Sequence, residues 1–263
     1  MASLLNISLS GFRGVSALGD KEKKHPPLLF IHGAFADHCN FENWLSFFAQ
    51  NGYDALALSR RGRNGIGPHN ASGLNFQDYL DDVIAQAGAC ERKPILIGHS
   101  LGGLLAMKAA EAGHAAATVL VCSAPPAMLT AQLGSLPSFI PMMPGIFLGR
   151  PILPSYPALR KIAFNAMPEA DAKRLALKVI PESGIVYRQM LLGAIRLDSA
   201  KHPCPALCIG AGQDRIISKG LYQYTAKSTN ATLLEYPKHG HFIMEEPGAE
   251  KVAGDILAWL RSL

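Results

Sequence analysis

A serine lies at a glycine-rich turn between an apolar run and a run of good helix formers. Residues 94–97 read Pro-Ile-Leu-Ile, residues 98–102 read Gly-His-Ser-Leu-Gly, and residues 103–110 favour a helix. A sharp strand-to-helix turn exposes the serine hydroxyl and places it near a helix N-terminus. Glycines are needed on both sides because side chains there would clash with the neighbouring strand and helix. The sequence therefore predicts a strand–turn–helix unit with Ser100 as a candidate nucleophile.

Apolar strands and amphipathic helices alternate through much of the chain. Strands are expected at residues 28–31, 54–58, 94–97, 117–122, 205–209 and 232–236, and helices at 40–50, 76–87, 103–110, 219–227 and 252–260. This alternation is typical of a mostly parallel sheet covered by helices on both faces. Residues 5–9 and 15–18 are expected to add an antiparallel hairpin at one edge. A chain of 263 residues, 49% hydrophobic, can form one large domain.

Residues 125–200 interrupt the alternation. Eight of the 18 prolines lie between residues 125 and 157, and five of the eight methionines lie within the interruption. Short helices are expected there, for example at 169–179. An insertion of this length in a compact domain is usually functional or disordered, and its apolar content argues against disorder. We expect a cap, or lid, at 125–200 over a core domain formed by residues 1–124 and 201–263.

The cap is rich in side chains that suit an apolar ligand. Met128, Met142 and Met143 are candidates for a substrate pocket, since such pockets are mostly hydrophobic. The alternative is that these side chains only pack the cap onto the sheet.

Charge and cysteine content exclude some classes of function. The net charge is +5, with basic groups at 21–24 and 60–63, but no basic stripe with interleaved aromatic residues is present. We therefore expect a solvated basic surface and no nucleic-acid partner. Cys122 and Cys208 lie in apolar runs, where free thiols behave as small core residues. All five cysteines are expected to be reduced, which favours a cytoplasmic protein.

Segments for targeting, membrane insertion or metal binding are not expected. The first 18 residues lack a basic start and a long apolar stretch, so a signal peptide is not predicted. Apolar runs fall short of 18 residues, so no integral membrane segment is predicted. Cys204 and Cys208 are four residues apart, which is not a zinc spacing.

A serine hydroxyl needs a base to remove its proton, and that base needs an orienting acid. In this strand–helix order, both should follow Ser100 at the ends of later strands. Asp214 follows a predicted strand and a glycine turn, and His241 lies in the loop before the last helix. His239 is the alternative base and Asp198 the alternative acid.

The negative oxygen formed after nucleophilic attack needs backbone N–H donors. One donor is expected from Leu101, directly after the serine. The second is expected from Ala34, with Phe35 as the alternative, in the loop after the first apolar strand. His32 is expected to hold that loop by hydrogen bonds. His99 is expected to pack beside the nucleophile, and both His99 and Phe35 are candidate pocket residues.

Together these motifs resemble the α/β-hydrolase superfamily. The resemblance rests on residues 32–34, 98–103, 212–214 and 240–241, and it extends from Leu28 to the final helix. It implies an α/β-hydrolase fold, with an eight-stranded, mostly parallel sheet flanked by helices and a helical cap after strand 6. Such caps vary widely within the superfamily.

In that superfamily the loop after strand four usually carries an acidic residue followed by Arg-Gly-His-Gly. This chain departs from the pattern at Ser59 and Arg63. Dehalogenases and epoxide hydrolases of this fold place Asp at the turn, so Ser100 excludes both. The resemblance implies a serine hydrolase that needs no cofactor and no metal.

The favoured activity is hydrolysis of a carboxylic ester, thioester or lactone with a fairly apolar acyl or aromatic group, through an acyl-enzyme on Ser100. The partner would be a small-molecule substrate, and the sequence predicts no oligomeric state. Alternatives on the same residues are an acyltransferase, lyase, perhydrolase or cofactor-free oxygenase, because fold does not fix function. A non-catalytic binding protein is a further alternative, although a pure binder has no need of all three groups.

Overall fold

One eight-stranded sheet forms the centre of the protein. The computed structural model describes residues 3–19, 25–63, 67, 69–130, 132–198 and 202–263. The strand order is β1-β2-β4-β3-β5-β6-β7-β8. The strands are β1 (Leu5–Leu9), β2 (Phe12–Ala17), β3 (Leu28–Ile31), β4 (Ala55–Leu58), β5 (Ile95–His99), β6 (Ala117–Val121), β7 (Ala206–Ala211) and β8 (Thr232–Tyr236). β2 pairs antiparallel with both β1 and β4, and the pairings from β4 through β8 are parallel.

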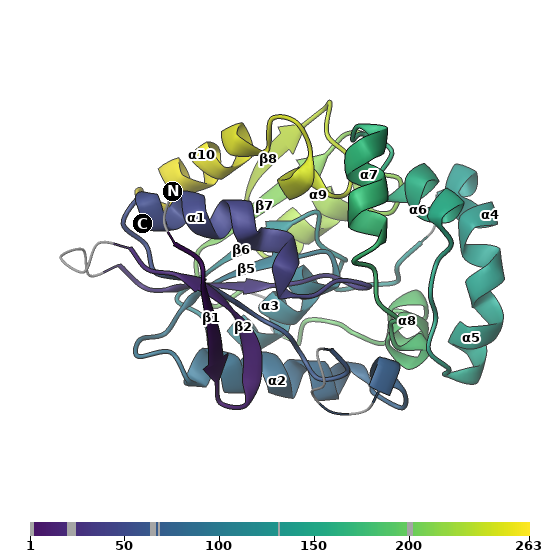
Figure 1. Cartoon of the computed structure of the whole chain (residues 1–263), viewed down its shortest axis with the longest axis horizontal. Helices are drawn as coiled ribbons and strands as arrows, with labels where there is room; N and C mark the ends of the chain where they lie inside the picture. Colours follow the sequence, from purple (N-terminus) through teal and green to yellow (C-terminus); the bar gives the residue numbers. More distant parts are fainter. Residues whose placement is uncertain (1–2, 20–24, 64–66, 68, 131, 199–201) are drawn as a thin grey trace.

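Helices cover both faces of this sheet (Figure 1). They are α1 (Glu42–Gln50), α2 (Phe76–Gly88), α3 (Leu101–Glu111), α9 (Lys219–Ser228) and α10 (Ala249–Leu260). α1 and α10 contribute to one buried cluster, and α2, α3 and α9 to the other. Alternate residues of a buried strand enter the two clusters: Ile95 and Ile97 face the first, and Leu96 faces the second. The apolar runs of the central strands are thus explained by burial on both faces.

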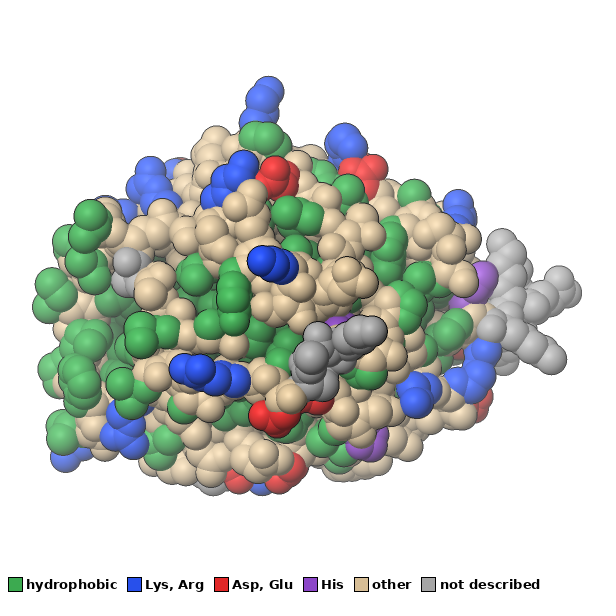
Figure 2. Space-filling view, turned by 180° about the vertical axis from the view of Figure 1, so that it is seen from behind, with side chains coloured by type: hydrophobic (Ala, Val, Ile, Leu, Met, Phe, Trp, Pro, Cys, Tyr) green, Lys and Arg blue, Asp and Glu red, His purple; other side chains and the backbone are tan. Residues whose placement is uncertain are grey.

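A helical insertion separates β6 from β7. It contains η3 (Leu133–Ser135), α4 (Leu136–Phe139), η4 (Ile140–Met142), α5 (Met143–Leu148), α6 (Tyr156–Ile162), α7 (Glu169–Ala176) and α8 (Gly184–Leu191). We call this part of the chain the insertion. It extends the molecule beyond the carboxyl ends of the parallel strands (Figure 1). Seen from behind, hydrophobic side chains gather along the edge on which α4 and α5 lie (Figure 2).

The expected α/β-hydrolase fold is confirmed, including the antiparallel strands at one edge and the helical segment after the sixth strand. Several boundaries differ from expectation by a few residues, and two of them concern segments near the site. A 3₁₀ turn, η1 (His38–Phe41), precedes α1, and the helix expected at 169–179 ends at Ala176. Lys178 and Val179 instead lie in the chain that leads toward α8, and both contact the pocket described below. The basic group at 21–24 lies outside the described residues.

Two further expectations concern cysteines and membranes. All five cysteines are free thiols in the structure. Of the helices in the described part of the chain, none combines the length and the apolar character needed to cross a bilayer.

Candidate active site

Ser100 occupies a strained turn between β5 and α3. Its backbone has φ 53° and ψ −119°, a conformation that residues other than glycine rarely adopt. Neighbouring glycines make the turn sterically possible. A Cβ on Gly102 would lie 2.0 Å from the carbonyl oxygen of Ile31, and a Cβ on Gly98 would lie 2.3 Å from that of Gly102. The close packing of β5, α3 and β3 therefore fixes the serine at the edge of the sheet.

Asp214 and His241 meet beside this turn, from the loops after β7 and β8. His241 Nδ1 donates to Asp214 Oδ2 over 2.7 Å, and both residues are buried. The other carboxylate oxygen accepts the backbone N–H groups of Ile216 (2.7 Å) and Ile217 (2.8 Å). These two backbone N–H groups hold the Asp214 carboxylate in place. The carboxylate in turn fixes the His241 tautomer in which Nδ1 carries the proton and Nε2 has a free lone pair.

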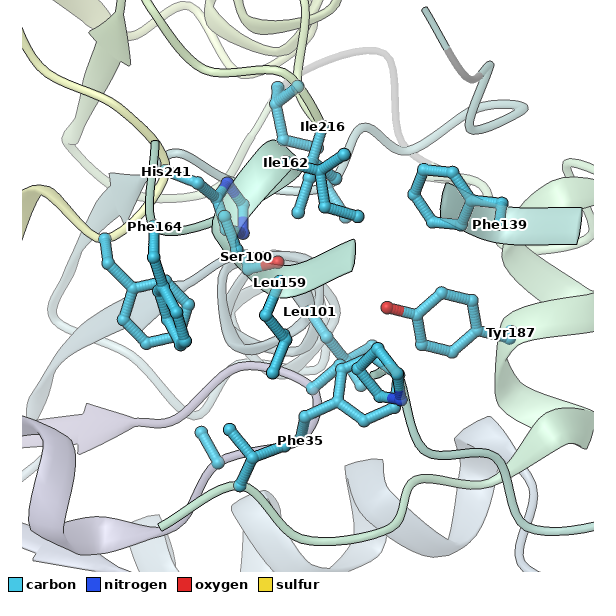
Figure 3. A pocket seen from close by; sticks show the side chains of 18 of the residues that line it. Phe35, Ser100, Leu101, Phe139, Leu159, Ile162, Phe164, Tyr187, Ile216 and His241 are labelled. Atoms are coloured by element: carbon cyan, nitrogen blue, oxygen red, sulfur yellow. The ribbon is translucent and has the colours of Figure 1, made fainter. Parts of the chain in front are cut away.

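Ser100 and His241 line the same pocket, which lies between the core and the insertion. Figure 3 shows the Ser100 hydroxyl beside the His241 ring, with apolar side chains around them. Phe35 comes from the core, whereas Phe139 and Tyr187 come from the insertion. Lys178 is the one charged side chain among the described lining residues, apart from His241 if protonated. The pocket therefore suits an apolar group next to the polar side chains of Ser100 and His241.

Backbone N–H groups of two segments also border the pocket. Leu101 is the first residue of α3, where backbone N–H groups have no partner within the helix. Ala34 and Phe35 line the pocket from the loop after β3, and Phe35 has a left-handed backbone with φ 60°. A Cβ on Gly33 would lie 3.1 Å from the Ser100 Cβ, so this loop runs directly against the serine.

A buried arginine fixes that loop. The Arg60 guanidinium donates to the carbonyl oxygens of His32 (2.5 Å) and Gly33 (3.3 Å). His32 Nδ1 donates to the Gly33 carbonyl, and its Nε2 accepts the backbone N–H of Arg60. Burial and the nearby Arg60 lower the pKa of His32 well below its ordinary value, so the ring is neutral. His32 thus has the structural contacts expected of it.

The expectation of a solvated basic surface at 60–63 is wrong for Arg60 and Arg63, which are 0% and 2% exposed. Arg63 Nη2 lies 2.5 Å from Glu182 of the insertion, and its Nε donates to the Ala36 carbonyl. The Tyr79 hydroxyl donates to the other Glu182 oxygen over 2.6 Å. Arg63 has acceptors on both the core and the insertion, whereas Arg60 uses its two Nη groups and its buried Nε has no hydrogen-bond partner among the described residues.

Electrostatics of this cluster favour the charged pair. Burial raises the pKa of Glu182, but the Arg63 and Arg60 guanidiniums outweigh it and leave the pKa below its ordinary value. Burial also lowers the pKa of Arg63, and the attraction of Glu182 more than reverses that effect. In the described part of the chain no carboxylate lies within hydrogen-bond distance of Arg60, and burial together with repulsion from Arg63 lowers its pKa to about 10.

Two other groups support the His241 loop. His99 Nε2 donates to the His241 carbonyl over 2.9 Å, and burial followed by the proximity of His241 lowers the pKa of His99 well below its ordinary value. Glu246 Oε2 accepts the Gly240 backbone N–H over 2.8 Å and faces His239 Nδ1 over 3.2 Å. The His239 ring therefore interacts with the Glu246 carboxylate, whereas the His241 ring is hydrogen-bonded to Asp214.

Some predicted pocket residues lie elsewhere. Met142 lines the pocket, but Met128 and Met143 are not among the lining residues: Met128 is 53% exposed, and Met143, the first residue of α5, packs half-buried against the second core cluster. His99 is buried behind the lining rather than in it, since its ring is engaged by the His241 carbonyl. Asp198 is excluded as the acid, because its exposed side chain pairs with Lys108.

Metal ligands are scarce near the pocket. In the described ranges, one group of three suitable side chains gathers within 4.8 Å: Asp37, His38 and Cys39. Asp37 already accepts the Cys39 backbone N–H, and His38 Nδ1 bonds with the Ser59 hydroxyl. These side chains thus serve the turn before α1.

Comparison with known proteins agrees with this geometry. The sequence model of the alpha/beta hydrolase family matches residues 28–253. The chain belongs to that family. A curated relative, the non-heme chloroperoxidase of Streptomyces lividans, is 35% identical over 107 residues, covering 39% of this chain and 38% of that protein. The chain therefore matches well under two thirds of the length of this relative.

Solved structures resemble the whole chain. The monoacylglycerol lipase of Paleococcus ferrophilus has a TM-score of 0.70 at 18% identity and covers 99% of both chains. The esterase EaEST of Exiguobacterium antarcticum has a TM-score of 0.69 at 17% identity and covers 99% of this chain and 100% of its own. At such low identity these likenesses establish the shared fold.

Proposed function

We propose that this alpha/beta hydrolase cleaves a carboxylic ester, or a thioester or lactone, with an apolar acyl or aromatic group. The observation that carries the proposal is the buried Asp214–His241 pair, whose His241 lines one apolar pocket together with the strained Ser100. A serine activated by a histidine that a carboxylate orients is the arrangement that acyl transfer requires. Structural neighbours named as esterases and lipases support the same class.

In the proposed mechanism, the Ser100 hydroxyl attacks the ester carbonyl while His241 Nε2 takes its proton. Asp214 stabilises the resulting imidazolium and keeps the ring in position. The backbone N–H groups of Leu101 and Ala34, or Phe35 in place of Ala34, bind the negative oxygen. His241 then gives its proton to the leaving alcohol, and an acyl-enzyme remains on Ser100. Water, deprotonated by His241, attacks that acyl group and releases the acid.

The lining favours acyl groups without a positive charge. Phe139, Leu159 and Ile162 extend the apolar wall away from Ser100 (Figure 3). An ammonium on the acyl group would lose its hydration there without a matched partner, because the charged side chain among the described lining residues is Lys178, which is itself positive. We therefore expect p-nitrophenyl esters of butyrate or hexanoate to be hydrolysed faster than the ester of an acid that carries a trimethylammonium group.

The test compares the wild type with Ser100→Ala. A fluorophosphonate should label the wild type once, as read by intact mass, and should not label the variant. Turnover of p-nitrophenyl butyrate should fall by about 10⁶-fold in the variant, as when a triad nucleophile is lost elsewhere. Retention of more than a few per cent of the activity by the variant would remove Ser100 from the mechanism.

The likeness to non-heme chloroperoxidases favours a second candidate, perhydrolysis. Hydrogen peroxide would then attack the acyl-enzyme in place of water, giving a peracid that oxidises halide in solution. Both reactions need Ser100, so the variant alone does not separate them. Bromide oxidation that requires both acetate and hydrogen peroxide, and that Ser100→Ala abolishes, would establish the second reaction.

A further inference from the structure

The outer side of the insertion exposes an apolar surface. Five large apolar side chains of η3, α4, η4 and α5 are solvent-exposed: Leu133 (86%), Leu136 (43%), Ile140 (64%), Phe147 (63%) and Leu148 (65%). We call these five residues the apolar face. Figure 2 shows hydrophobic side chains gathered along this edge of the molecule. Single exposed apolar residues are common, but a group within 16 residues of sequence marks an interaction surface.

The same segment borders the pocket on its inner side. Phe139 and Met142 line the pocket, while Leu136 and Ile140, which alternate with them along the chain, point outward. One short layer of helix thus separates the apolar face from the pocket. A partner on the outer side would lie within a helix diameter of the bound substrate.

The charge around the apolar face is positive. Residues 112–168 contain no Asp or Glu, although they include Arg150, Arg160 and Lys161. Residues 125–200 contain eight basic and four acidic residues, so they account for +4 of the net charge of +5. Arg150 is exposed two residues after the end of α5, and the Arg188 guanidinium donates to the Phe147 carbonyl over 2.6 Å.

The four acidic residues of this stretch do not offset that charge locally. Glu182 is buried against Arg63, and Asp198 pairs with Lys108 of the core. Glu169 pairs with Arg160, and Asp171 with Arg174; both acids lie on α7 rather than on the helices of the apolar face. The apolar face is therefore bordered by positive charge that lacks an acidic counterpart on η3 to α5.

This charge pattern argues against a second copy of the chain as the partner. A two-fold interface brings the same surface of each copy together. Two surfaces that both carry positive charge would then face each other, and like charges across an interface oppose association. An anionic partner with an apolar interior satisfies both features of the surface.

We propose that the apolar face seats on an anionic lipid surface. Ile140, Phe147 and Leu148 would enter the boundary between headgroups and acyl chains, and Arg150 would contact lipid phosphate. The attachment is peripheral, through short helices that lie on the bilayer. It would bring the pocket next to apolar molecules held in that bilayer. The proposal concerns attachment and stands whether or not the chain is an esterase.

Co-sedimentation with vesicles tests it, using Ser100→Ala so that lipid hydrolysis does not alter the vesicles. Vesicles of equal parts phosphatidylglycerol and phosphatidylcholine should bind the protein, and vesicles of phosphatidylcholine alone should bind it at least tenfold more weakly. Phe147→Ser/Leu148→Ser should reduce binding to the anionic vesicles at least tenfold. Arg150→Gln should reduce it about fivefold and flatten its salt dependence, as expected for one basic side chain near the surface.

Matched controls come from the same insertion. Leu177 and Leu192 are 89% and 65% exposed but lie outside the apolar face, so Leu177→Ser/Leu192→Ser should bind like its parent. Circular dichroism checks that each variant is folded. Equal loss of binding in this control, or unchanged binding in the Phe147/Leu148 variant, would overturn the proposal. The proposal would also be overturned if analytical ultracentrifugation showed a dimer of the parent protein and a monomer of the Phe147/Leu148 variant, because a second copy would then be the partner.

Discussion

Replacing Glu182 by Gln tests how strongly the insertion is anchored to the core. The carboxylate has three partners: Arg63 Nη2 on one oxygen, and the Tyr79 hydroxyl and Ser183 backbone N–H on the other. A glutamine has the same shape, but in place of the two carboxylate oxygens it offers one acceptor oxygen and one NH₂ donor group. If its oxygen faces Arg63, its NH₂ group opposes the Ser183 N–H. If its NH₂ group faces Arg63, two donors oppose each other at the ion pair.

Either orientation leaves Arg63 without a compensating charge at 2% exposure. Removing one partner of a buried ion pair typically costs about 3–5 kcal/mol. For a chain of this size, 1 kcal/mol corresponds to about 2–4 °C in melting temperature, so Glu182→Gln should lower it by about 6–20 °C. Tyr79→Phe removes a single hydrogen bond to the carboxylate and should cost about 1.5–3 kcal/mol.

Thermal unfolding at pH 7, followed by circular dichroism, measures these effects. The control is Glu169→Gln, since Glu169 pairs with Arg160 at the surface with 52% of its side chain exposed, and it should lower the melting temperature far less. A drop for Glu182→Gln no larger than that for Glu169→Gln would refute the assignment of the buried pair as an anchor.

The effect also has a defined pH dependence. The folded-state pKa of Glu182 is lowered, so its contribution to stability is fully present above its unfolded-state pKa, near the ordinary value of 4.5. It is lost as the pH falls through the folded-state pKa. The difference in melting temperature between wild type and Glu182→Gln should therefore be constant at neutral pH and shrink below about pH 4.5. A difference that grows on acidification would contradict the pairing.

Two further predictions concern the proposed catalytic residues and the turn that carries Ser100. Asp214→Asn should lower kcat for p-nitrophenyl butyrate by about 10⁴-fold without unfolding the protein, because the amide NH₂ would face His241 Nδ1 and select the wrong tautomer; a loss below tenfold would exclude Asp214 as the orienting acid. Gly102→Ala should prevent folding or sharply lower the melting temperature, since its Cβ would lie 2.0 Å from the Ile31 carbonyl oxygen. Gly254→Ala on α10 meets no atom within 4 Å and should stabilise the protein by up to about 1 kcal/mol. Equal melting temperatures for the two alanine variants would refute the steric argument.

The sheet and the ends of its strands could be predicted because they depend on local signals. A run such as 28–31 is apolar throughout, and glycine turns follow the strands that lead to Ser100 and Asp214. Parallel strands bring their carboxyl ends to one edge of the sheet. Ser100 and Asp214 are 114 positions apart in sequence, and Asp214 and His241 are 27 apart, yet all three are expected to lie together at that edge. The structure places Asp214 and His241 within hydrogen-bond distance at that edge, and their catalytic roles remain a proposal.

The buried cluster of Arg63 and Glu182 could not be predicted, because the two residues are 119 positions apart and charged side chains are rarely buried. The departure of Arg63 from the superfamily pattern was visible, but its partner was not. The insertion posed a different difficulty. Its helices are four to eight residues long, too short for periodicity to show which side faces inward. Met142 and Met143 are adjacent in sequence, and only the former borders the pocket.

The pairing of β6 with β7 has a consequence for how the protein can change. Because these strands are neighbours in the sheet, the insertion leaves and re-enters the core through strands about 5 Å apart. Doubling the length of such an excursion adds only about 0.6 kcal/mol of loop-closure entropy. The segment is therefore a replaceable module: its length and side chains can be exchanged to give a new binding wall while the strands that carry Ser100, Asp214 and His241 stay unaltered.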